Sequence, residues 1–173
     1  MRKNVVVQFD QHEKHNRFAG VSPNDLNPVE QQMLVTMALT VMEHRYQPGE
    51  LMGSPMETKW YLRLRFAGRQ AEVFACLFLD TGNRVICFEE LFYGTIDAAP
   101  VYPREVVRRA LEVNAAAVVL AHNHPSGDPE PSRADITLTQ RLKEALGLVE
   151  IRVLDHIVVG AASSVSFAER GMI

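Results

Sequence analysis

Two histidines and one aspartate in the second half of the chain have the types and spacing of a metal-binding site. His122 and His124 lie two residues apart at the end of an apolar segment predicted to be a buried strand. Because the side chains of a strand alternate between its faces, both imidazoles lie on one face and can bind one ion. A loop rich in proline and glycine then leads to Asp135, predicted in the first turn of a helix.

Two imidazoles and one carboxylate form a ligand set typical of catalytic zinc. They leave one of the four tetrahedral positions open for water, whereas structural zinc sites are closed by protein ligands. Zinc lowers the pKa of bound water from about 15.7 to about 7 and so supplies hydroxide at neutral pH. The pattern therefore predicts one zinc ion per chain, bound by His122, His124 and Asp135, and hydrolytic chemistry.

Each part of this pattern also has an ordinary structural explanation. Ser132 and Asp135 have the spacing of a capping box, in which Asp135 would only bond the backbone at the helix start. His122 and His124 could be half-buried polar residues at a strand end. Both parts together, joined by a loop of this composition, favour the metal site.

The segments around these residues predict alternating helices and strands. Helices are expected after Asn27, after Ser54, from Pro103 and after Ser132, where capping residues or prolines precede apolar helical patterns. Strands are expected at residues 73–79, 84–92, 116–121, 151–154 and 157–159, with a hairpin turn at 80–83. This alternation is typical of a layered α/β domain with a mixed sheet.

Composition indicates a soluble globular protein of one domain with a small appendage. Of the 173 residues, 47% are hydrophobic and 23% charged, enough for a core without disulfides. Cys76 and Cys87 form no Cys-x-x-Cys pair, so reduced thiols in a cytoplasmic protein are expected. No signal peptide and no membrane-spanning segment are expected. A net charge of −3 argues against a dedicated nucleic-acid-binding protein.

Residues 1–53 are predicted to form a polar arm and an N-terminal helix, and residues 54–173 the catalytic domain. The helix carries an apolar stripe typical of a core or an interface, and a homodimer through this helix is left open. The stripe consists of Met33, Leu34, Met37 and Val41.

The spacing of the site residues resembles the motif of a known family. His122-x-His124, seven residues, Ser132, two residues and Asp135 resembles, without a gap, the pattern of the JAMM (also called MPN or JAB) zinc metallopeptidases. Six neighbouring segments resemble the RadC branch of that family, so that the resemblance covers about residues 54–171. They are residues 78–80, 91–96, 103–107, 114–126, 151–160 and 166–170.

The resemblance implies a fold and a role for each residue of the motif. The fold is a cytidine-deaminase-like arrangement of α/β/α layers around a mixed sheet, here with an N-terminal helical extension. His122, His124 and Asp135 match the zinc ligands. Ser132 matches the serine that stabilises the oxyanion of the tetrahedral intermediate.

The resemblance also implies a glutamate that acts as general base. In the family it opens an upstream strand, and here Glu72 opens the strand that follows the second helix. Glu89 and Glu90 are the competing candidates, near the far end of the partner strand. Asn123 stands between the two histidines, where many JAMM peptidases have Ser or Thr, and this is typical of the RadC branch.

The implied function is zinc-dependent hydrolysis of a peptide or isopeptide bond, with a peptide or protein as substrate. Full-length RadC proteins carry a helix-hairpin-helix region that residues 1–53 do not match, so the chain resembles the short form found on mobile elements. The alternative is a DNA-associated accessory protein of such an element with a non-catalytic zinc site. A base deaminase is set aside because its His-x-Glu and Pro-Cys-x-x-Cys signature is absent.

Two further pairs of residues are open to two interpretations. Asp155 and His156 could orient the ligands from outside the ligand set, as metal ligands usually require, or could be ordinary core residues. Arg104 and Arg108 are four residues apart on one helix face. They could bind an acidic partner or a phosphate, but a solvated face is expected.

Overall fold

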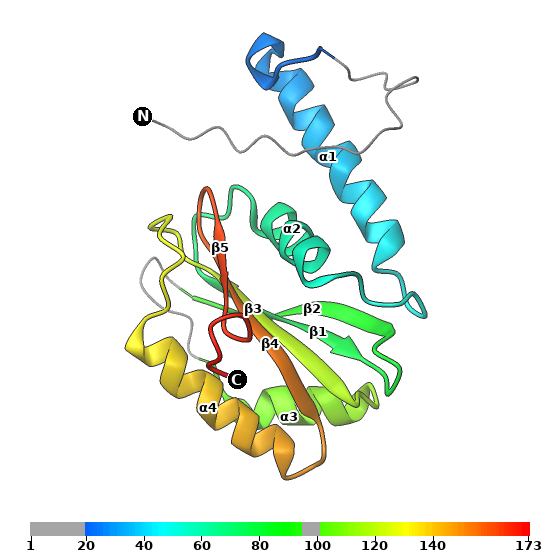
Figure 1. Cartoon of the computed structure of the whole chain (residues 1–173), viewed down its shortest axis with the longest axis vertical. Coiled ribbons are helices and arrows are strands. Elements are labelled where there is room, and N and C mark those ends of the chain that lie inside the picture. Colours follow the sequence, from blue (N-terminus) through cyan, green and yellow to red (C-terminus); the bar gives the residue numbers. More distant parts are fainter. Residues whose placement is uncertain (1–19, 95–100) are drawn as a thin grey trace. The chain divides into compact units, whose positions relative to one another are not determined.

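The computed structural model describes residues 20–94 and 101–173 (Figure 1). Its contacts divide the chain into two compact units, residues 1–36 and 37–173. Most of the predicted polar arm lies outside the described residues, and the domain boundary expected between residues 53 and 54 stays a prediction.

Helix α1 (Pro28–Arg45) begins where the sequence predicts, in the first unit, and continues into the second. The side chain of Asn27 accepts hydrogen bonds from the backbone of Val29 and Glu30, and the Glu30 carboxylate accepts one from the Asn27 amide. The apolar stripe of α1 is not buried in the core, since Met33 is 60% exposed. Its use as an interface stays a prediction.

The described residues of the second unit form one sheet of five strands in the order β2-β1-β3-β4-β5. Strands β3 and β4 are parallel and all other neighbours are antiparallel, so the sheet is mixed, as the sequence predicts. The strands are β1 (Val73–Leu79), β2 (Val85–Tyr93), β3 (Ala117–Asn123), β4 (Arg152–Val159) and β5 (Ser164–Ser166).

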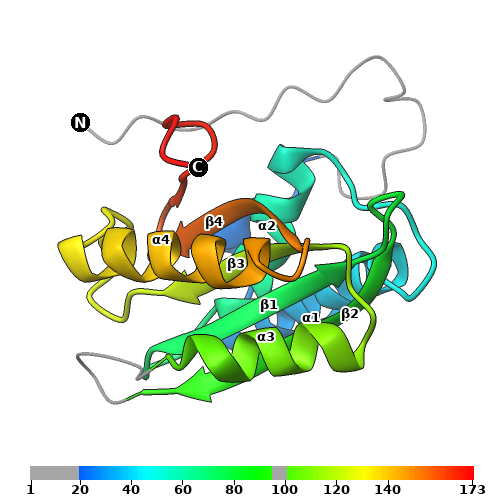
Figure 2. The ribbon, with the colours of Figure 1, turned by 90° about the horizontal axis from the view of Figure 1, so that it is seen from below.

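Helices cover both faces of this sheet. Helix α2 (Pro55–Phe66) lies on one face, and α3 (Pro103–Glu112) and α4 (Arg133–Gly147) lie on the other (Figures 1 and 2). Alternate residues of β1 separate the two cores, because Leu77 packs with α2 whereas Cys76 packs with α3 and α4. The α/β class is thus confirmed, and the likeness to cytidine deaminases stays a prediction.

The two closing strands predicted at residues 151–154 and 157–159 are one strand, β4. It contains a β-bulge, because the neighbours Val118 and Val119 of β3 pair with Val153 and Asp155, which are two residues apart. The strand therefore continues through Asp155, and Leu154 is the extra residue of the bulge. The short strand β5, which the sequence did not predict, pairs with β4.

Burial in the sheet explains why the two cysteines are protonated thiols. Both are free; Cys76 is buried and Cys87 is partly buried. Burial raises the pKa of the Cys87 thiol to about 11 and also raises that of Cys76, so both stay protonated at neutral pH. No described helix is long and apolar enough to span a membrane.

Candidate metal centre

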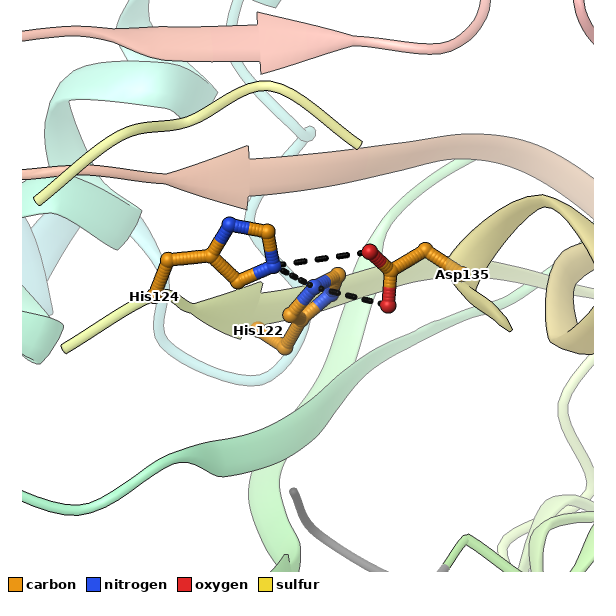
Figure 3. A group of neighbouring side chains, drawn as sticks. All are labelled: His122, His124 and Asp135. Atoms are coloured by element: carbon orange, nitrogen blue, oxygen red, sulfur yellow. Dashed lines mark hydrogen bonds and ion pairs between the residues drawn. The ribbon is translucent and has the colours of Figure 1, made fainter. Parts of the chain in front are cut away.

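The three residues expected to bind zinc lie together (Figure 3). His122 and His124 extend from the end of β3, and Asp135 faces them from the first turn of α4. The Nε2 atoms of the histidines are 3.0 Å apart, and they lie 3.3 and 3.4 Å from the two carboxylate oxygens of Asp135. Zinc–ligand bonds of about 2.0–2.1 Å in a tetrahedron separate the ligand atoms by about 3.3 Å. These separations are close to that value, and one donor atom from each residue lies within 4.8 Å of the others, so the cluster could hold an ion of this size.

Hydrogen bonding fixes which nitrogen of His124 faces the cluster. Its Nδ1 atom lies 2.8 Å from the backbone carbonyl oxygen of Asp128. A carbonyl oxygen only accepts, so Nδ1 carries the hydrogen and Nε2 of the neutral ring presents a lone pair. That lone pair and the Asp135 carboxylate point to the same place, an arrangement that favours a cation.

The charges in the cluster support the same conclusion. Burial opposes ionisation of Asp135, but the adjacent His122 and His124 rings outweigh this effect and hold its pKa well below the usual range. The adjacent Asp135 carboxylate raises the pKa of His124, because its negative charge favours a positive charge at Nε2, and the negative charge of Glu72 makes a smaller contribution. With both rings neutral, the site carries the negative charge of Asp135, which a cation can neutralise.

Ser132 has the capping role that the sequence offered as the alternative explanation. Its hydroxyl accepts a hydrogen bond from the Asp135 amide at 3.1 Å, and Asp135 Oδ2 accepts one from the Ser132 amide at 2.7 Å. The same carboxylate also faces both histidines. The capping box and the cluster are therefore compatible, because the cap orients Asp135 towards β3.

The loop between His124 and Ser132 is held against the residues that follow β4. The Gly127 carbonyl oxygen accepts a hydrogen bond from the Ala161 amide at 3.0 Å. A Cβ atom at Gly160 would lie 2.8 Å from Cδ of Pro129 and would also overlap with the Gly127 carbonyl. Only glycine at residue 160 lets the loop approach this closely.

We expect Gly160→Ala to lower the free energy of unfolding by about 1–3 kcal/mol, because the added methyl group overpacks the site, and to weaken metal binding. Gly147→Ala is the matched control, since nothing lies within 4 Å of a Cβ atom there. Urea unfolding and zinc titration of both variants check this. Equal stability and affinity in the two variants would contradict it.

Glu72 lies directly before β1 and is held there by Asn123. The Asn123 side chain accepts a hydrogen bond from the Val73 amide at 2.9 Å and donates one to the Ala71 carbonyl at 3.1 Å. It thus binds the residues on both sides of Glu72. Asn123 is buried and lies between the two histidines. Its place in the motif is the sequence signal that could have indicated its role in holding the residues beside Glu72.

The competing carboxylates are both held by arginines. Arg109 binds Glu89 with two hydrogen bonds, which lower the pKa of Glu89. Arg69 donates to both carboxylate oxygens of Glu90, at 2.8 and 2.9 Å. Of the three glutamates, Glu72 is the one whose charge acts on His124.

Asp155 and His156 have different structural roles. His156 Nε2 lies 2.8 Å from Nδ1 of His122, and burial lowers the His156 pKa far enough to keep the ring neutral. Asp155 instead holds the end of the chain, since its carboxylate accepts hydrogen bonds from the Ser166 hydroxyl and the Ala168 amide.

The two arginines of α3 lie on an exposed face. Arg108 pairs with Glu105 and with Glu112 of the same helix. Arg104 also pairs with Glu105, at 3.3 Å, and its side chain is 86% exposed. These contacts are those expected of a solvated helix face.

Comparisons with known proteins agree with the geometry. A family model described as RadC-like JAB domain matches residues 52–172. A UPF0758 protein of Vibrio cholerae is 63% identical over 134 residues, which are 78% of this chain and 84% of that protein. UPF0758 proteins of Marinobacter nauticus and Nitrosococcus oceani are 59% and 57% identical over 82% of this chain, and the matched part spans 63% of each of them.

Proposed function

The chain belongs to the family of RadC-like JAB domains, and on this basis we propose that it is a zinc-dependent hydrolase of peptide or isopeptide bonds. One observation carries the proposal. His122, His124 and Asp135 direct electron-pair donors to one point, while Glu72 lies outside this cluster, directly before β1. In the proposed site these three residues are the metal ligands and Glu72 is a separate base.

The proposed roles follow from the chemistry of each side chain. Zinc held by the three ligands supplies a Lewis acid and lowers the pKa of water. The Glu72 carboxylate takes a proton from the attacking water and passes it to the leaving amine. The Ser132 hydroxyl accepts a hydrogen bond from the Asp135 amide, so its own O–H group stays available. This O–H group donates a hydrogen bond to the substrate carbonyl oxygen, where negative charge develops.

The proposed substrate is a peptide or protein, and the proposed location is the cytoplasm. The function is tested by measuring zinc per chain with elemental mass spectrometry and then cleavage of a peptide and isopeptide library. We expect about one zinc per chain and cleavage that a chelator abolishes. A folded protein that does not take up added zinc would overturn the proposal. Salt-dependent DNA binding in a gel shift would instead favour the accessory protein with a non-catalytic site.

Asn123→Ala should lower turnover by about 10–100-fold and leave the zinc content unchanged. The substitution removes both hydrogen bonds that hold the residues beside Glu72, while His122 and His124 keep their own contacts. Steady-state hydrolysis and zinc content are measured on the same samples. Turnover equal to that of the wild type, or a parallel loss of zinc, would show that Asn123 does not act through Glu72.

A further inference from the structure

A chain of hydrogen bonds behind His122 ends on the backbone of another residue of the metal cluster. Nδ1 of His122 lies 2.8 Å from Nε2 of His156, and Nδ1 of His156 lies 2.6 Å from the Thr139 hydroxyl. That hydroxyl donates to the Asp135 carbonyl oxygen at 2.6 Å. Thr139 lies one turn after Asp135 on α4. The chain thus links the ring of one residue of the cluster to the backbone of another.

One arrangement of hydrogen atoms satisfies every bond in this chain of hydrogen bonds. The Asp135 carbonyl oxygen only accepts, so Thr139 uses its single proton there and must accept a hydrogen bond from Nδ1 of His156. The neutral His156 ring then has no hydrogen on Nε2, and this atom accepts from Nδ1 of His122. Nε2 of His122 is left with its lone pair facing the cluster formed with His124 and Asp135.

Water cannot replace any partner in this chain of hydrogen bonds, because the side chains involved are buried. His122, Thr139 and His156 are each at most 2% exposed. The ring of Phe167 stacks on His156 with the centroids 4.8 Å apart, and the Phe74 ring meets His156 edge-on with the centroids 5.7 Å apart. A lost hydrogen bond here therefore leaves a buried polar group without a partner, which costs about 1–3 kcal/mol.

We propose that Thr139 and His156 are positioning residues that fix the tautomer of His122, so that Nε2 is ready to bind the metal. Asp128 fixes the same tautomer in His124 through its carbonyl oxygen. Without these contacts a neutral imidazole can carry its hydrogen on either nitrogen, and metal binding must first move it. The inference rests on the proposed metal site and is independent of which bond is cleaved.

Thr139→Val tests this inference, because valine has the shape of threonine and lacks the hydroxyl. His156 then loses the acceptor for its Nδ1 hydrogen, and the hydrogens of His156 and His122 are free to shift to Nε2. We expect zinc affinity, measured by competition with a chelator, to fall about 10–100-fold. Thr139→Ser keeps the hydroxyl and should retain the affinity of the wild type.

Nitrogen-15 NMR of the histidine rings provides a second readout on the metal-free full chain. In the wild type and in Thr139→Ser, Nδ1 of His122 and of His156 should carry the hydrogen, and in Thr139→Val it should not. A wild type with the hydrogen on Nε2 of His122 overturns the inference even if Thr139→Val fails to fold. Unchanged tautomers and affinity in a folded Thr139→Val overturn it as well. The expected tautomers in a wild type that binds no zinc would support the hydrogen-bond chain and contradict the proposed function.

Discussion

Replacement of Glu72 by glutamine is expected to remove nearly all turnover and to leave about one zinc per chain. Glutamine has the size of glutamate but cannot take up a proton, and general base catalysis contributes about 10²–10⁴-fold to such reactions. Glu72 is not part of the cluster of His122, His124 and Asp135, so metal binding should not depend on it. The measurement is hydrolysis of a cleaved library peptide together with zinc content.

Two matched controls use the same change of glutamate to glutamine. Glu89→Gln and Glu90→Gln alter the competing carboxylates, which Arg109 and Arg69 hold on β2. Both variants should turn over like the wild type once their stability is taken into account. Activity retained in Glu72→Gln but lost in one of the controls would assign the base to β2.

Replacement of Asp135 by asparagine is expected to abolish zinc binding in a protein that still folds. Asparagine removes the carboxylate charge that faces both histidines, and its side-chain oxygen can still accept the hydrogen bond from the Ser132 amide. Zinc at 100 times its dissociation constant stabilises a folded protein by about 2.7 kcal/mol. We expect this stabilisation in the wild type and none in Asp135→Asn. Thermal unfolding with zinc and with chelator measures it.

Glu130→Gln is the control for the loss of one negative charge from the same region. The Glu130 carboxylate pairs with Arg170 at 2.7 Å on the surface. This variant should bind zinc and gain stability from it as the wild type does. A zinc-dependent rise in stability of Asp135→Asn as large as that of the wild type would remove Asp135 from the ligand set.

The features of the site that could be predicted are those encoded within short segments. His122 and His124 share a face because of the strand period, and Ser132 caps α4 by a rule that needs only neighbouring residues. Hydrophobic periodicity likewise located β1, β2 and α3. Each of these features depends on residues only a few positions apart.

Features that depend on distant partners could not be predicted. Asp155 suggested a break between two strands, because a partly buried carboxylate in a strand needs more donors than the adjacent His156 amide supplies. The other donors come from Ser166 and Ala168, more than ten residues later. The link between Thr139 and His156 also requires α4 and β4 to be packed together first.

The order of strands in the sheet bears on how the chain folds during synthesis. After the β1–β2 hairpin, β3 pairs with the free edge of β1, β4 with that of β3, and β5 with that of β4. No strand has to insert between two strands already paired, so the sheet can grow as the ribosome extends the chain. His122 lies on an open edge until β4 brings His156 beside it. Loading of the metal is therefore expected to be a late event, after β4 has emerged from the ribosome.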